Sequence, residues 1–397
     1  MTELGTTLRK TALHERHRAL GAKMTEFHGW EMPLYYSSIL EEHRAVRQAM
    51  GLFDISHMGQ VLVTGEEAVR TLNEVMVSDL TQVGTGRACY TLMLNESGGI
   101  VDDLIVYRIG DREYLLIVNC ANRTVDVEWL TAHRQGDARV SDISQGRSIL
   151  AIQGPLAARV LEELLDAKVA GLGRFEIAPI RTMGPEACLA RTGYTGGDGF
   201  ELFVQDHHAK RLWDLILSTA KPLGALPVGL GARDTLRVEA GLRLNGTDMD
   251  GATTPFEAGL DWTVAINKPS FIGKEVLVRQ RCEGLSRKFV GFELSQGPIP
   301  RHGMELMAEA VKVGVVTSGT YSPTLNRPLG MGYVEPARSA PGSALSLSVR
   351  SRRYTATVVK LPFWKGDTKP AGRLVGTAPL ISPSSPTKEA WPHARSA

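Results

Sequence analysis

Apolar and polar positions follow a helical period in several parts of the first 250 residues. Residues 38–50 place apolar side chains on one helical face, Ser38 and Glu41 form a capping-box pattern, and Gly51 follows as a stop. We therefore predict a helix over 38–50. The same reasoning predicts helices near residues 66–76, after Pro155, at 208–219 and from about Gly231 through Glu239.

A second period, alternation over two residues, predicts strands. Residues 60–64, 148–153, 188–191 and 200–204 are candidates. The most informative stretch has two alternating segments, 103–109 and 113–118, on either side of a Gly-Asp hairpin signal. Folding the chain about residues 110–112 brings Asp103 opposite residue 118 or 119, depending on the loop type. In either case Asn119 is expected to lie close to Asp103.

The pattern changes after about residue 252. Short strand candidates at 289–294, 311–317 and 345–361 alternate with Gly and Pro turns, which predicts a small β-barrel domain. From Gly366 onward the chain is rich in Pro, Ser, Gly and Thr and has no periodic pattern. We predict a disordered tail over 366–397.

Composition narrows the class of protein. The 397 residues are 43% hydrophobic and carry a net charge of +2, so no strong field favours nucleic acid. No apolar run reaches about 18 residues, so no membrane span is predicted. The N-terminal stretch has no apolar signal core and contains Glu3 and Glu15, which favours a cytoplasmic protein. The four cysteines form no C-x-x-C pair, so neither a zinc site nor a disulfide framework is indicated.

Several catalytic motifs are incomplete. The segment HERH at 14–17 is one residue short of H-E-x-x-H, and VGLGARD at 228–234 lacks the last glycine of G-x-G-x-x-G. The chain contains no Walker A motif and no G-x-S-x-G elbow. We therefore predict no metal, no nucleotide-phosphate cradle and no serine nucleophile.

Polar residues in apolar or turn contexts are the remaining candidates. Asp103 stands at the mouth of an apolar strand, where an acid is costly to bury unless it is paired or useful. It could instead cap the turn at Gly98-Gly99. Glu201 begins a strand and could be a surface acid or part of an ion pair. Arg233 opens a helix and could pair with a nearby acid on the same helix.

Three tyrosines add possible stacking surfaces, although tyrosines on strands are more often ordinary packing. They are Tyr90, Tyr107 and Tyr194.

Eight segments then occur in a recognisable order. They are FHGWEMPLYY (27–36), MGLFDISHMG (50–59), LNESGGIVDDLIVYR (94–108), RTGYTGGDGFEL (191–202), GLGARDTLRVEAGL (229–242), LNGTDMD (244–250), FIGKE (271–275) and TSGTYSPTL (317–325). Together they resemble the glycine cleavage T-protein, an aminomethyltransferase family. The resemblance extends from about Thr11 to Lys365.

The resemblance implies an α+β fold of three domains arranged as a cloverleaf around a central funnel. The first domain is expected to be discontinuous, over 1–56 and 147–251. The second, over 57–146, is inserted into it and carries Asp103. The third, over 252–365, is expected to be the C-terminal β-barrel, followed by the tail.

The resemblance also implies site residues. The second aspartate of GGIVDDL, Asp103 rather than Asp102, matches the critical carboxylate of the family. Glu201 and Arg233 are similar to folate-binding residues. The positions expected to line the funnel are Tyr90, Tyr107, Asn119 and Tyr194. Lys365 stands near a position where some relatives carry Arg, and a lysine lacks the bidentate fork for a carboxylate.

The implied reaction joins tetrahydrofolate, as co-substrate and without a metal, with an aminomethyl group on the lipoyl arm of a carrier, the H-protein. Ammonia leaves, and 5,10-methylenetetrahydrofolate and dihydrolipoyl carrier form. A fixed carboxylate at Asp103 could orient the folate amine, relay its proton and stabilise an iminium-like cation. The sequence does not decide which of these roles dominates.

Because one fold can serve several folate proteins, other functions stay open. An accessory protein of iron–sulfur assembly is disfavoured, because NKPSFIGKE (267–275) has no cysteine. The folate module of a flavin-linked dehydrogenase is disfavoured by the lack of a flavin-binding domain ahead of it. A folate-dependent demethylase of a small methylated compound, or a non-catalytic folate-binding regulator, stays possible.

Overall fold

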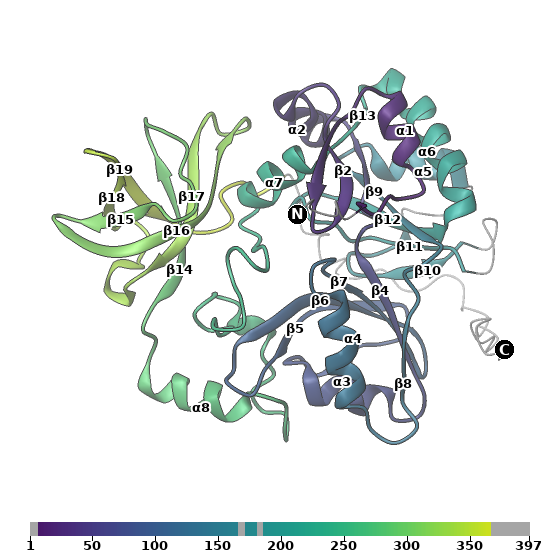
Figure 1. The fold of residues 1–397 in the computed structure, drawn as a ribbon, viewed down its shortest axis with the longest axis horizontal. Helices are drawn as coiled ribbons and strands as arrows, with labels where there is room; N and C mark the ends of the chain where they lie inside the picture. The colour runs from purple at the N-terminus through teal and green to yellow at the C-terminus, as the bar shows by residue number, and fades with distance from the viewer. Residues whose placement is uncertain (1–6, 166–170, 181–185, 367–397) are drawn as a thin grey trace, which may run out of the picture.

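Three β-structures surround a common centre (Figure 1). The computed structural model describes residues 7–165, 171–180 and 186–366. Helices and strands are mixed along the chain, so the predicted α+β class is confirmed. The predicted tail lies outside the described residues except for Gly366. Within the described ranges, no helix has the length and apolar character needed to cross a membrane.

The first body is a six-stranded sheet with strand order β10-β11-β12-β9-β3-β13. Its strands are β3 (Gly51–Asp54), β9 (Arg147–Gln153), β10 (Ile177–Pro179), β11 (Cys188–Ala190), β12 (Gly199–Gln205) and β13 (Leu226–Pro227). Helices α5 (Ala157–Leu165) and α6 (Asp206–Ala220) pack their apolar sides against one face, where Trp213 is fully buried. Burial of these apolar side chains stabilises this layer.

Two further helices of this body stand near the barrel. They are α2 (Ile39–Gln48) and α7 (Leu230–Glu239). The predicted cap of α2 is confirmed, because the Ser38 side chain accepts a hydrogen bond from the Glu41 amide at 3.2 Å. The N-terminal segment adds α1 (His14–Ala19) and the hairpin of β1 (Lys23–Phe27) and β2 (Trp30–Tyr35).

The second body is an antiparallel sheet with strand order β5-β6-β7-β4-β8. Its strands are β4 (Gly59–Thr64), β5 (Arg87–Leu94), β6 (Ile100–Gly110), β7 (Glu113–Val118) and β8 (Arg139–Asp142). Helices α3 (Ala68–Val75) and α4 (Arg123–Ala132) cover one face. The predicted hairpin is β6–β7, and the pairing of Ile105 with Ile117 directs Asp103 toward residue 119.

The uncovered faces of these two sheets pack on each other. Phe53, Ile149 and Phe203 of the first sheet share an apolar cluster with Tyr107 and Ile117 of the second. Helices α2 and α7 contribute to the same cluster. Side chains on the inner face of β6 and at the carboxyl side of β7 are therefore held between two layers.

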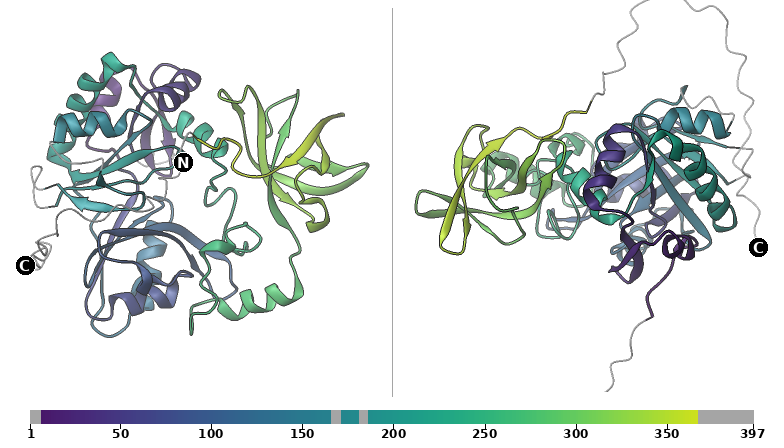
Figure 2. Two further views of the ribbon diagram at one scale, coloured as in Figure 1. Left: turned by 180° about the vertical axis from the view of Figure 1, so that it is seen from behind. Right: turned by 90° about the horizontal axis from the view of Figure 1, so that it is seen from above.

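The third body is a closed barrel with strand order β14-β17-β16-β15-β18-β19, which confirms the predicted barrel. Its strands are β14 (Lys288–Leu294), β15 (Glu305–Ala308), β16 (Val311–Ser322), β17 (Arg327–Val334), β18 (Ala344–Val349) and β19 (Arg352–Val359). The predicted single strand at 345–361 is two strands, because the chain reverses at Arg350, which has a φ of 55°. Both views of Figure 2 place the barrel to one side of the other bodies.

The sequence pattern after residue 252 predicted strands and did not indicate a helix before the barrel. Helix α8 (Lys274–Glu283) lies there, and Leu277 is its only buried residue, so its sequence has no apolar stripe to announce it. The residues between α7 and the barrel pack on the ends of β5 and β6 through an apolar cluster that includes Leu92, Ile100 and Phe271.

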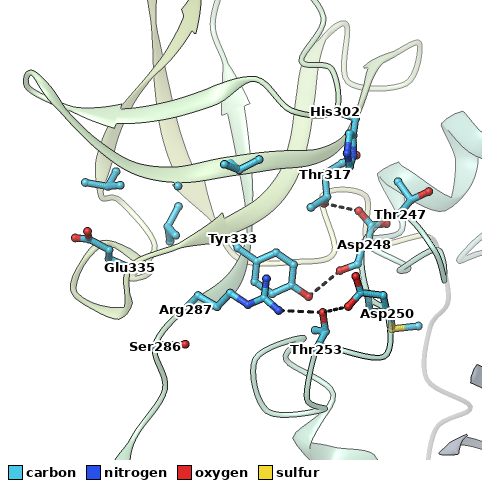
Figure 3. Close-up of a pocket in the computed structure, with 15 residues that line it drawn as sticks. Thr247, Asp248, Asp250, Thr253, Ser286, Arg287, His302, Thr317, Tyr333 and Glu335 are labelled. Atoms are coloured by element: carbon cyan, nitrogen blue, oxygen red, sulfur yellow. Dashed lines mark hydrogen bonds between the residues drawn. The ribbon is translucent and has the colours of Figure 1, made fainter. Parts of the chain in front are cut away.

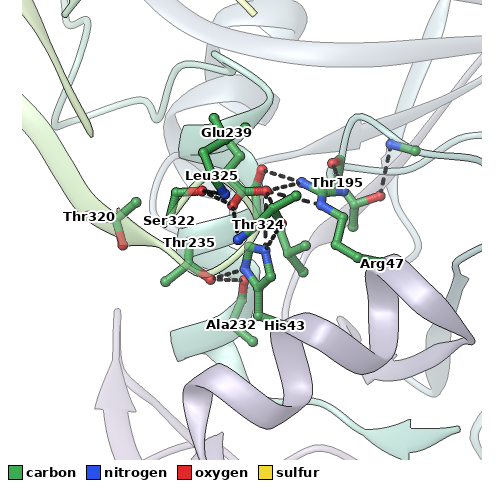
Figure 4. A network of polar contacts seen from close by, with 12 residues as sticks. His43, Arg47, Thr195, Ala232, Thr235, Glu239, Thr320, Ser322, Thr324 and Leu325 are labelled. Atoms are coloured by element: carbon green, nitrogen blue, oxygen red, sulfur yellow. Dashed lines mark hydrogen bonds and ion pairs between the residues drawn. The ribbon is translucent and has the colours of Figure 1, made fainter. Parts of the chain in front are cut away.

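A buried polar network connects the barrel to the first body (Figure 4). The Glu239 carboxylate at the end of α7 accepts hydrogen bonds from Arg47 Nε at 3.1 Å, Thr324 Oγ1 at 3.1 Å and the Ser322 hydroxyl. His43 Nε2 lies 3.1 Å from the same carboxylate. Burial would raise the pKa of Glu239, but the hydrogen bond and charge of His43 outweigh it and lower this pKa to about 2.

Glu239 is fully buried, so removing it should be costly. We expect Glu239→Ala to lower the free energy of unfolding by about 3–5 kcal/mol, because Arg47 is left buried without its carboxylate. Denaturant unfolding of the full chain, followed by circular dichroism, measures this loss. Glu305→Ala is the matched control, since Glu305 forms an exposed pair with Lys312 at 3.1 Å and should change stability by less than about 1 kcal/mol. Equal losses for the two variants would contradict the argument.

Candidate active site

The β6–β7 hairpin holds Asp103 by two side-chain hydrogen bonds. Asn119 Nδ2 donates to Asp103 Oδ1 at 3.0 Å, and the Tyr90 hydroxyl donates to Oδ2 at 3.0 Å. The contact between Asp103 and Asn119 that the strand pattern predicts is confirmed. Each carboxylate oxygen has one donor, so the group is fixed in orientation and keeps lone pairs for a further partner.

The surroundings of Asp103 favour its neutral form. Burial, and next the charge of neighbouring Asp102, raise the pKa of Asp103 to about 7, although the hydrogen bonds from Tyr90 and Asn119 act in the opposite direction. In the described part of the chain no cation forms a salt bridge with Asp103 or Asp102. A carboxyl with this pKa can both accept and donate a proton near neutrality.

Glu201 lies on β12 and is 7% exposed. Two donors meet at one of its oxygens: Thr192 Oγ1 lies 2.6 Å and the Tyr107 hydroxyl 3.2 Å from Oε2. Among the residues that the structure describes, none donates a hydrogen bond to Oε1. Glu201 is thus a buried carboxylate with one oxygen left for a ligand.

Arg233 stands in the first turns of α7, over the ring of Tyr194 at 4.7 Å from the ring centre. The Tyr194 hydroxyl donates to the Arg243 carbonyl, which fixes the ring. Burial lowers the pKa of Arg233. Its guanidinium donates no hydrogen bond to any acceptor within the described ranges, so its donors are available to a bound oxygen.

The charges of Asp103 and Arg233 both act on Tyr194, and the charge of Glu201 acts on Arg233. Asp103 and Arg233 therefore lie within electrostatic range of Tyr194, and Glu201 within that of Arg233. Tyr90 joins them through its hydrogen bond to Asp103.

Two predicted residues are placed differently from the others. Tyr107 was expected to line the funnel, but its side chain is fully buried between the two sheets and donates to Glu201. It supports a site residue and offers no open surface. Lys365 is exposed and follows Trp364, whose ring lies 3.6 Å from the Arg47 guanidinium carbon.

Residues that the sequence reasoning missed also belong here. Trp262 is 67% exposed and stacks on Tyr90 with ring centres 5.8 Å apart, so it extends the aromatic surface beside Asp103. Asn122 donates to Asp102 at 2.7 Å and so takes part in the polar cluster behind Asp103. The only sequence signal for Asn122 is its place in NCAN, directly after the predicted hairpin.

A separate pocket of about 370 Å³ lies between the barrel and residues 247–253 (Figure 3). The Tyr333 hydroxyl donates to the Asp248 carbonyl at 2.7 Å, and Arg287 Nη2 donates to Thr253 Oγ1 at 3.0 Å. None of the predicted site residues lines this pocket. Over the described ranges, no group of three or more His, Cys, Asp or Glu side chains could hold a metal ion.

Comparison with known proteins agrees with this geometry. Residues 13–268 match the family described as GCVT N-terminal domain, and residues 287–365 match the glycine cleavage T-protein C-terminal barrel domain. The chain is 44% identical over 356 residues to an aminomethyltransferase of Halothermothrix orenii, covering 90% of this chain and 100% of that protein. It is 45% identical over 361 residues to an aminomethyltransferase of Rubrobacter xylanophilus, covering 90% and 95%.

A solved structure is also similar. The crystal structure of the glycine cleavage system aminomethyltransferase T from Bartonella henselae has a TM-score of 0.85 and 34% identity, and the match covers 90% of this chain and 99% of that one. Both parts of the chain, and nearly the full length of its relatives, are therefore accounted for. The chain belongs to the glycine cleavage T-protein family, and its activity is that of an aminomethyltransferase of the glycine cleavage system.

Proposed function

We propose that Asp103 is the catalytic carboxylate in the transfer of a methylene carbon from the aminomethylated lipoyl arm of an H-protein to tetrahydrofolate. One folate nitrogen and then a second form bonds to the aminomethyl carbon, and the carbon–sulfur and carbon–nitrogen bonds that held this carbon break. The two protons that leave the folate nitrogens end on the dihydrolipoyl sulfur and on ammonia. The product that holds the carbon is 5,10-methylenetetrahydrofolate.

The observation that carries this proposal is the state of the Asp103 carboxyl. It is half-buried, is oriented by Tyr90 and Asn119, and has a pKa raised by desolvation to about 7. An ionised carboxylate there can take the folate proton and can stabilise a developing cation. Both roles need the negative charge at the moment of reaction.

Glu201 and Arg233 support binding of the folate. A pterin presents a ring N–H and an amino group as paired donors, which a carboxylate such as Glu201 accepts well. Arg233 has donors only and serves a folate oxygen, while Tyr194 and Tyr90 offer flat walls. Asn119 and Tyr107 orient Asp103 and Glu201. We assign Lys365 to the carboxylate end of the folate, as a point charge without a bidentate fork.

The partner and setting are part of the same proposal. Tetrahydrofolate is the co-substrate, and a lipoylated H-protein in the cytoplasm is the carrier. We propose that residues 1–56 with 147–251, residues 57–146 and residues 252–365 act as three domains. The meeting of Asp103 from the second segment with Glu201 and Arg233 from the first supports this division.

The first test is turnover of aminomethylated H-protein with tetrahydrofolate, followed by ammonia and methylenetetrahydrofolate formation. We expect kcat/KM to rise with pH through about 7, since the ionised Asp103 is required. Asp103→Asn and Asp103→Ala should each lower kcat by about 10²-fold or more and remove this rise.

Folding serves as the control for this test. Because the pKa of Asp103 is raised in the folded state, its ionisation costs stability as the pH rises from about 4 to 7. Asp103→Asn should therefore melt no lower than the parent at pH 7.5. Undiminished turnover of Asp103→Asn would exclude both the proton and the charge roles. If the parent protein binds folate but shows no turnover, the alternative of a non-catalytic folate-binding regulator would be supported.

A second prediction concerns folate affinity. Glu201→Gln and Arg233→Lys should each weaken tetrahydrofolate binding about 10- to 100-fold, because a charge-assisted hydrogen bond contributes about 1.5–3 kcal/mol. Isothermal titration calorimetry measures the dissociation constants. The matched controls are Glu305→Gln and Arg16→Lys, both in exposed ion pairs, which should leave affinity unchanged. If the site variants bind folate as tightly as these controls, the folate site lies elsewhere.

A further inference from the structure

Two further carboxyl groups, from two elements, lie near the proposed catalytic residue Asp103. Asp102 and Asp103 are neighbours on β6, and Asp126 is on α4, which covers the same sheet. The side chains of Asp102 and Asp126 are fully buried, at 0% exposure. Three negative charges so close together would repel one another strongly. We therefore expect at least one of the three carboxyl groups to be protonated at neutral pH.

Asp102 has the surroundings of an anion. Its Oδ2 accepts from the Asn119 amide nitrogen at 3.0 Å. Its Oδ1 accepts from Asn119 Nδ2 at 2.8 Å and from Asn122 Nδ2 at 2.7 Å. Asn122 is held in turn, because its Nδ2 also donates to Asn245 Oδ1 at 3.0 Å. Burial raises the pKa of Asp102, and these three donors act in the opposite direction by stabilising its charged form.

Asp126 has the opposite surroundings. It follows Asn122 by one turn of α4, with its amide nitrogen 2.8 Å from the Asn122 carbonyl oxygen. Neither of its carboxyl oxygens meets a hydrogen-bond donor in the described structure. Asp102 is the side chain that acts most strongly on Asp126, so the two carboxyl groups are neighbours. Two carboxyl groups can hydrogen-bond each other only if one of them carries a proton.

Among the residues that the structure describes, no cation forms a salt bridge with Asp126 or Asp102. The charged groups that act on Asp126 are Asp102 and Asp103. Two cations on the packed helices have other partners: Arg123 on α4 pairs with Asp142 on β8 at 2.6 Å, and Arg70 on α3 pairs with Glu67 at 3.5 Å. Beyond β7, Cys120 is buried, and its pKa is raised by burial to about 11, so it is neutral.

We propose that Asp126 is a positioning residue. It stays a neutral carboxylic acid, and its hydroxyl group donates a hydrogen bond to the Asp102 carboxylate. The pair then carries one proton and one negative charge. This assignment rests on the proposed role of Asp103, because its consequence is felt there. It gives both oxygens of Asp102 a full set of donors and gives the buried Asp126 hydroxyl an acceptor.

The consequence for Asp103 runs through Asn119. The same Nδ2 group donates to Asp102 and to Asp103, at 2.8 and 3.0 Å. A fixed Asp102 anion therefore fixes the amide that orients Asp103, and its single charge helps to raise the pKa of Asp103. The pKa of Asp126, raised by burial and next by Asp102 to about 10, is consistent with a proton retained through neutral pH.

The test compares Asp126→Asn, which keeps a neutral donor of similar shape, with the parent chain. Asp111→Asn, at an exposed position in the β6–β7 turn, is the control. Thermal unfolding is measured between pH 4.5 and 8. In the parent, the unfolded chain releases the Asp126 proton above pH about 4 and the folded chain keeps it, so stability falls as the pH rises. Asparagine has no such proton.

We subtract the melting temperature of the parent from that of Asp126→Asn at each pH. This difference should be larger at pH 7.5 than at pH 4.5 by at least about 2 °C. Asp111→Asn should follow the parent. The pH at which kcat/KM is half-maximal should stay within about 0.3 units, since one neutral group replaces another. A constant offset in melting temperature, or a downward shift of one unit or more in the pH profile, would overturn the proposal by showing an ionised Asp126.

A spectroscopic measurement keeps the proposal testable even if Asp126→Asn does not fold. In Asp103→Asn labelled with carbon-13 aspartate, a buried carboxylic acid should give a C=O stretching band that persists at pH 8. No such band in the folded protein would refute the shared proton. This readout needs no turnover, so its failure is distinct from a failure of the proposed catalytic role.

Discussion

The burial of a negative charge without a cation is the constraint on which the site depends. Asp103 is half-buried, and in the described part of the chain its carboxylate accepts hydrogen bonds from the neutral donors Asn119 and Tyr90. A salt bridge to a cation would have lowered the pKa of Asp103. The carboxylate would then have stayed ionised and could not have exchanged a proton near neutral pH. Neutral donors orient the group and still leave it able to exchange a proton near pH 7.

The second carboxylate of the site, Glu201, is also held by a neutral donor, which reaches it across the interface between the two sheets. Tyr107 lies on β6, on the same face as Asp103. Its hydroxyl donates a hydrogen bond across the interface to Glu201 on β12. One strand therefore supplies the carboxylate for chemistry and the support for the carboxylate that is proposed to bind folate. A change in the packing of the sheets would move both groups together, which links the stability of this interface to the geometry of the site.

Local sequence patterns predict the parts of the site that depend on one hairpin. The alternation around Gly110 places Asn119 beside Asp103, and the structure agrees. The same alternation puts Tyr107 on the face of Asp103 but cannot show that another sheet buries it. Trp262 reaches Tyr90 from a segment far along the chain, and no period announces that contact. Glu201 and Arg233 entered as candidates through the family resemblance, because each alone has an ordinary surface interpretation.

The segment between α7 and the barrel shows why the start of β6 has its particular sequence. The amide of Ile100 lies 3.2 Å from the Asp250 carbonyl oxygen and 3.0 Å from that of Thr253. Asn95 Nδ2 also donates to the Gly251 carbonyl at 2.9 Å. A Cβ atom at Gly99 would lie 1.9 Å from this same carbonyl oxygen, so only glycine allows the approach.

Asn245 of this segment accepts from Asn122 at 3.0 Å, so the segment also touches the polar cluster behind Asp103. At its far end the chain enters the barrel, which is joined to α2 and α7 through Glu239. The three bodies thus form a closed circuit of contacts around Asp103. Because these contacts are directional and several are at least partly buried, the position of the carboxylate depends on the neighbouring segments as well as on its own hairpin.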